Sequence, residues 1–136
     1  MQLKIYAGLR PILGAAGILA GMLVAPASAA GPELAMLDGL RKGSWEMRIR
    51  GEAPRRMCVR SGRELIQLQH KQSGCSRYVI DDKPGEVTVQ YSCPGNGYGR
   101  TTIRRENPSL VQIRSQGIQG GMPFSIEGEA RKTGSC

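Results

Sequence analysis

The sequence predicts a small, mainly β protein: an antiparallel sheet, arranged as a sandwich or a partly closed barrel, with one short helix and two disulfides. Three observations lead to this prediction. Runs of β-forming residues, most of them alternating between apolar and polar, recur about seven times along the chain, roughly eight to twelve residues apart. Turn-forming glycines, prolines and asparagines separate them. The chain contains four cysteines, and disulfides are rare in cytosolic proteins of this size but common in small exported ones.

Residues 1–29 are predicted to be a secretory signal peptide. Lys4 and Arg10 precede an apolar run of about 13 residues, and small residues occupy positions 27–29. The run is shorter than the roughly 20 residues that span a bilayer, and no cysteine follows it directly to carry a lipid anchor. Cleavage before Ala30 by a bacterial exporter predicts a periplasmic or secreted protein with no transmembrane helix.

The remaining chain divides into a short N-terminal segment, residues 30–42, and a single disulfide-stapled β-domain, residues 43–136. Leu34, Leu37 and Leu40 are spaced by three residues, which predicts one or two helical turns before Gly43. Strict alternation over 44–51 then predicts a strand with Trp45 in the core, and a second strand covers 55–60.

Residues 61–71 are predicted to form the second helical stretch. Ser61 and Glu64 have the S-x-x-E spacing of a capping box, directly before the apolar residues Leu65, Ile66 and Leu68. We expect the apolar stripe to lie on the sheet. His70, with no carboxylate or cysteine nearby in sequence, is expected at the polar end of this helix as a solvated surface group.

The stretch from Cys75 to Cys93 predicts a stapled hairpin. Two β-rich runs flank the turn formers at 82–86, and folding the stretch about Pro84 places Cys75 opposite Cys93, Val79 opposite Val89, and Asp81 opposite Val87. Directly opposite residues lie within disulfide range. Further strands are predicted at 98–106, 109–118 and 124–131.

The hairpin register pairs Cys75 with Cys93 and leaves Cys58 with Cys136. A zinc site is the alternative use of four cysteines. The sequence contains no C-x-x-C pair and a single histidine, so no metal and no other cofactor is expected.

The chain carries 19 lysines and arginines against 11 acidic residues, and loss of Lys4 and Arg10 with the signal lowers the net charge from +8 to +6. Arginines suit bidentate binding of phosphate or carboxylate. Candidate anion-binding residues are Arg48 and Arg50 on one strand, and Arg100 and Arg104 on another. The preferred explanation of the positive charge is that the arginines only keep the protein soluble. Nucleic acid is not expected, since only five aromatic residues follow the signal.

Several short features resemble the bacterial family called domain of unknown function 3617. They are Gly-x-Trp-Glu at 43–46, Cys58-Val59, the central cysteine pair, and R-x-x-G-x-C at 131–136. The resemblance covers about residues 43–136 and implies a small exported protein with disulfides. It brings no catalytic residue or ligand. In the family, a longer segment that contains methionine and proline precedes the first cysteine; here about a dozen residues do so.

The sequence favours a non-catalytic protein that binds an apolar or anionic envelope ligand. The main alternative is an interaction or inhibitor module for another exported protein, with residues 117–123 as a presenting loop. A hydrolase is less favoured, because catalysis would depend on His70 alone or on the adjacent Asp81 and Asp82. Thiol redox chemistry lacks the C-x-x-C motif that it normally uses.

Overall fold

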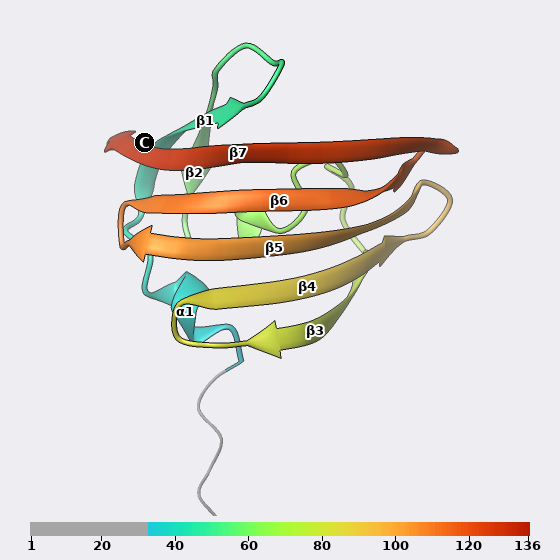
Figure 1. Ribbon diagram of the computed structural model, residues 1–136, viewed down its shortest axis with the longest axis horizontal. Helices are drawn as coiled ribbons and strands as arrows, with labels where there is room; N and C mark the ends of the chain where they lie inside the picture. Colours follow the sequence, from blue (N-terminus) through green and yellow to red (C-terminus); the bar gives the residue numbers. More distant parts are fainter. Residues whose placement is uncertain (1–32) are drawn as a thin grey trace, which may run out of the picture.

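The computed structural model describes residues 33–136, so the predicted signal peptide lies outside the described residues. It shows one antiparallel sheet of seven strands (Figure 1). The elements in chain order are α1 (Ala35–Asp38), β1 (Gly43–Ile49), β2 (Arg55–Val59), the 3-10 turn η1 (Arg63–Leu65), β3 (Ser76–Asp82), β4 (Glu86–Cys93), β5 (Gly97–Asn107), β6 (Leu110–Gln119) and β7 (Met122–Gly134). The mainly β class, the short helix and the two disulfides are confirmed.

The strands lie in the order β2-β1-β7-β6-β5-β4-β3, so β2 and β3 are the two edges. Sequential hairpins build the run from β3 to β7, and the first strand β1 then pairs with the last strand β7. Residues 60–75, here called the strap, connect one edge of the sheet to the other and pass behind β5 and β6 in Figure 1.

Alternation along the strands gives the sheet one apolar face. Trp45, Val89, Ile103 and Ile113 are among its buried side chains. Leu65, Ile66 and Leu68 of the strap cover this face, together with Leu34, Met36, Leu37 and Leu40 of the N-terminal segment. The predicted helical turn, the core position of Trp45 and the packing of the strap leucines on the sheet are therefore confirmed.

The β3–β4 hairpin has the predicted register at its open end and a shifted one near its turn. Ser76 lies opposite Ser92 and Val79 opposite Val89, as expected. A bulge at Ile80 then places Asp81 opposite Thr88, so the predicted pairing of Asp81 with Val87 is wrong. The extra residue shortens the turn to 83–86, where the Lys83 N–H donates to the Glu86 carbonyl (2.9 Å).

The predicted helix over 61–71 is wrong, because only η1 forms there. The capping contact exists: the Glu64 carboxylate accepts hydrogen bonds from the N–H groups of Ser61 (3.2 Å) and Arg60 (3.0 Å). Beyond this turn the strap carbonyls bind side chains instead of a helical ladder. The Ile66 carbonyl accepts from the Thr101 hydroxyl (2.7 Å), and the His70 carbonyl from the Gln67 amide (3.1 Å). The strap follows the sheet, and side chains supply the hydrogen bonds that a helix would otherwise provide.

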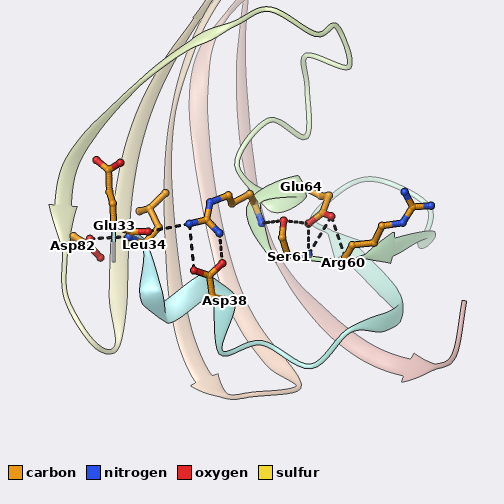
Figure 2. A network of polar contacts seen from close by, with 8 residues as sticks. Glu33, Leu34, Asp38, Arg60, Ser61, Glu64 and Asp82 are labelled. Carbon is orange, nitrogen blue, oxygen red and sulfur yellow. Dashed lines mark hydrogen bonds and ion pairs between the residues drawn. The ribbon is translucent and has the colours of Figure 1, made fainter. Parts of the chain in front are cut away.

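Polar contacts tie the N-terminal segment to the strap and to the β3–β4 hairpin (Figure 2). Arg63 of the strap forms an ion pair with Asp38, and its guanidinium also donates to the Glu33 carbonyl (2.9 Å). The Leu34 N–H donates to the Asp82 carboxylate at the end of β3 (2.9 Å). Helix α1 is thereby held against two parts of the chain that are distant from it in sequence.

Both predicted disulfides are present. Cys58–Cys136 joins β2 to the C-terminus, with Cα atoms 5.7 Å apart, and Cys75–Cys93 joins the end of the strap to β4, with Cα atoms 4.3 Å apart. Cys58 lies just before the strap and Cys75 is its last residue. The two bridges therefore anchor the two ends of the strap.

Candidate functional site

A cleft of about 420 Å³ lies where the strap meets strands β1 and β2. We call it the basic cleft. Its walls come from three parts of the chain: β1 and β2, the strap, and the start of β3. The lining residues are Met47, Arg55, Arg56, Met57, Glu64, Gln67, Leu68, His70, Lys71, Gln72 and Arg77.

Arg55 is the most unusual of these residues. Alternation along β2 places it on the same face as Met57 and Val59, directly opposite Met47 of β1. Its Nε and Nη2 atoms are buried, and neither has a hydrogen-bond partner among residues 33–136. Buried guanidinium donors without a partner are costly, since their lost hydration is not replaced. An acceptor in the cleft would relieve that cost.

Cations outnumber carboxylates around the cleft. Arg56, Lys71 and Arg77 line it together with Arg55, whereas Glu64 is the single acidic residue. Glu64 is already occupied by the N–H groups of Arg60 and Ser61 and by the Ser61 hydroxyl. Burial by itself would raise the pKa of Glu64, but its backbone and hydroxyl hydrogen bonds outweigh burial and lower that pKa below the usual value. The carboxylate stays ionised, and the cleft keeps a positive excess.

Gln67 holds part of this arrangement in place. Its amide nitrogen donates to the carbonyls of His70 (3.1 Å) and Gln72 (3.2 Å) within the strap. Its amide oxygen accepts from the Nη2 (2.9 Å) and Nε (3.2 Å) atoms of Arg77. Gln67 thus connects the fold of the strap to the position of the Arg77 guanidinium at the cleft.

His70 is buried at the base of the cleft, with 1% of its surface exposed, so the expectation of a solvated group is wrong. Its Nε2 atom lies 3.0 Å from the carbonyl oxygens of both Asn96 and Ile118, and therefore carries the hydrogen. Its Nδ1 atom lies 2.9 Å from the Tyr91 hydroxyl. Both nitrogens are engaged in internal hydrogen bonds, which leaves neither free to act on a ligand.

Tyr91 is buried beside His70. Burial raises the pKa of Tyr91, and the Ser115 side chain partly offsets this rise. The phenol therefore stays protonated and can donate to His70. Of this pair, His70 lines the cleft.

The four predicted anion-binding arginines do not come together. They lie on the outer, polar side, and β7 and β6 separate Arg48 of β1 and Arg50, which directly follows β1, from the two arginines of β5. Arg48 contacts Glu46 (2.7 Å), Arg104 contacts Glu106 (2.8 Å), and Arg50 lies 3.8 Å from Glu127. Arg100 has no ion pair within the described chain and lines a separate hollow of about 240 Å³ with Arg114.

The sequence did contain a signal for Arg55. In the run RRMCV the residues Arg55, Met57 and Val59 share one face, so an arginine stands in the apolar row of a strand. The other cleft residues had no such signal, because the strap that brings Gln67 and Lys71 to the sheet was expected to be a helix.

The comparisons with known proteins identify no relative: no family model, no curated protein and no solved structure matches this chain. The resemblance to domain of unknown function 3617 therefore stays a prediction. Within residues 33–136 the structure has no helix long and apolar enough to cross a membrane. Over the same residues, histidine, cysteine and acidic side chains nowhere gather in a group of three that would hold a metal ion.

Proposed function

We propose that this protein is an exported, non-catalytic binding protein whose basic cleft takes a small anionic ligand. The observation that carries the proposal is the Arg55 guanidinium, with two buried nitrogens that have no acceptor among residues 33–136. Arg56, Lys71 and Arg77 add positive charge around it. Phosphate and carboxylate groups match an arginine fork in both geometry and charge.

The state of the nearby polar groups supports binding without catalysis. His70 has both nitrogens engaged internally, and the Glu64 carboxylate accepts hydrogen bonds from the strap backbone. A general base needs a free lone pair within reach of a substrate proton. Neither group offers one in this arrangement.

Export to an oxidising compartment is the second part of the proposal. Two disulfides link the described chain, as is common outside the cytoplasm. Intact mass spectrometry of protein purified without reductant from bacterial periplasm tests this part. We expect the mass of residues 30–136 less four hydrogens. A mass that retains residues 1–29, or free thiols, would contradict it.

Ligand binding is tested by calorimetric titration with inorganic pyrophosphate at low and high salt. We expect binding that weakens with salt and that falls about tenfold or more in Arg55→Gln, because hydrogen bonds to charged groups are worth roughly 1.5–3 kcal/mol. Arg48→Gln is the matched control: it removes the same charge from the outer face and should leave the affinity within about twofold. Equal losses in both variants would mean that only net charge matters.

A further inference from the structure

We infer that the ligand of the basic cleft is an anionic amphiphile, with a phosphate or carboxylate head and a single short alkyl chain. This inference rests on the proposed function and narrows its ligand class. It follows from where the apolar side chains of the cleft lie relative to Arg55.

Three apolar residues line the cleft beside its cations. Met47 comes from β1, Met57 from β2 and Leu68 from the strap. Met47 lies directly opposite Arg55 across the strand pair, and Met57 is two residues along β2 on the same face. Opposite residues are about 5 Å apart and alternate residues about 7 Å apart. The head site and the apolar wall are therefore neighbours.

The lining of the cleft suits both parts of such a molecule, because it contains both cationic and apolar side chains. Arg55 presents unsatisfied donors to the head group, and Arg77, held by Gln67, adds a second guanidinium to the lining of the same cleft. Methionine side chains are flexible and polarizable, which lets them follow alkyl chains of different length. A purely inorganic anion would not use the apolar part of the lining that Met47, Met57 and Leu68 provide.

The volume of the cleft limits the number and length of alkyl chains that the ligand can have. A volume of about 420 Å³ is near the lower end of the range for small-molecule pockets, roughly 300–1,000 Å³. One short chain fits that volume better than the two chains of a membrane phospholipid. A lipid fragment and a free metabolite could both have this anionic head and single short alkyl chain.

Titration with inorganic phosphate and with hexyl, octyl and decyl phosphate, all below their micellar concentrations, tests the inference. We expect weak binding of phosphate and a gain of up to about fourfold for each added methylene that the cleft covers. Octyltrimethylammonium should not bind, because its head is cationic. Binding of dioleoyl phosphatidic acid vesicles as tight as that of decyl phosphate would contradict the single-chain limit.

NMR spectra of the methionine methyl groups in the unmodified protein locate the alkyl chain of the ligand. This measurement does not depend on a variant that must fold. With ¹³C-methyl methionine, the Met57 and Met47 signals should shift with octyl phosphate and not with inorganic phosphate. Met122, which is 70% exposed and outside the cleft, is the internal control and should not move. Met57→Gln should abolish the chain-length gain, and Met122→Gln should preserve it.

The outcomes separate the two proposals. If phosphate binds with Arg55 dependence but longer chains add nothing, the amphiphile inference is wrong and the anionic cleft stands. The affinity gain with alkyl length could persist in Met57→Gln, and the Met57 methyl signal of the unmodified protein could stay unshifted. In that case the alkyl chain lies elsewhere, and the inference is also wrong. If pyrophosphate, phosphate and the alkyl phosphates all fail to bind, both proposals fail.

Discussion

His70 connects four parts of the chain through one imidazole ring. From the strap it reaches Tyr91 of β4, the carbonyl of Asn96 in the β4–β5 turn and the carbonyl of Ile118 on β6. Phe124 of β7 packs edge-on against the ring, with centroids 5.8 Å apart. A buried polar side chain with this many partners specifies how the strap sits on the sheet.

Replacing His70 by alanine should lower the free energy of unfolding by about 2–4 kcal/mol, since the Tyr91 hydroxyl and two carbonyls lose a buried partner. Urea unfolding followed by Trp45 fluorescence measures the loss. Lys71→Ala, an exposed neighbour on the strap, is the control and should stay within about 0.5 kcal/mol of the unmodified protein. A similar, small effect of both changes would contradict the structural role of His70.

Gly99 leaves room for the Tyr91 ring, because it has no side chain. The two residues lie opposite each other on β4 and β5, and a Cβ atom at Gly99 would overlap the tyrosine ring. We expect Gly99→Ala to destabilise the protein by about 1–3 kcal/mol through overpacking. Gly85→Ala, where a Cβ would meet open space, should change stability by less than about 0.5 kcal/mol in the same urea experiment. Equal effects would place the Tyr91 ring elsewhere.

At the scale of elements, the strap is the part that sequence patterns describe least well. The capping motif correctly predicted that Glu64 turns back to Ser61, because this contact spans only three residues. It did not predict where the helix stops. The Ile66 carbonyl is taken by Thr101, 35 residues later, and such a partner is known only after the sheet has formed.

Glu64 should make the stability of the protein depend on pH in the acidic range. Its folded pKa is lowered, so its contribution is fully present above the unfolded pKa of about 4.5 and is lost as the pH falls through the lower folded value. Glu64→Gln should therefore destabilise the protein at pH 7 and have a progressively smaller effect below about pH 4. Thermal melts of both proteins between pH 3 and 7 measure this difference. A difference that grows toward low pH would contradict the sign.

At the scale of the whole molecule, the two disulfides enclose the strap and therefore the basic cleft. Cys58 lies opposite Ser44 of β1, and Ser44 lies opposite Gly134 of β7, so the first bridge ties edge strand β2 to the C-terminal residues that follow β7. The second bridge joins the strap to β4 beside the other edge strand. The cleft wall is held from both sides.

Loss of Cys58–Cys136 should cost more stability than loss of Cys75–Cys93. The sequence separations are 78 and 18 residues, which correspond in the chain-entropy model to about 4.5 and about 3 kcal/mol. The paired variants Cys58→Ser/Cys136→Ser and Cys75→Ser/Cys93→Ser, compared by urea unfolding, test the order. The reverse order would show that native-state contacts, and not loop length, dominate.

The sequence by itself determined the β class, the strand positions to within a few residues, the hairpin register near Cys75 and both disulfides. These depend on side-chain alternation and on turn residues, which act between neighbours in the chain. Only the tertiary structure decided that β1 pairs with β7, that His70 is buried, and that Arg55 lacks an acceptor. The physical reason is that burial and charge compensation belong to three-dimensional surroundings: Arg55 and Arg77 are far apart in sequence, and the strap brings them to one cleft.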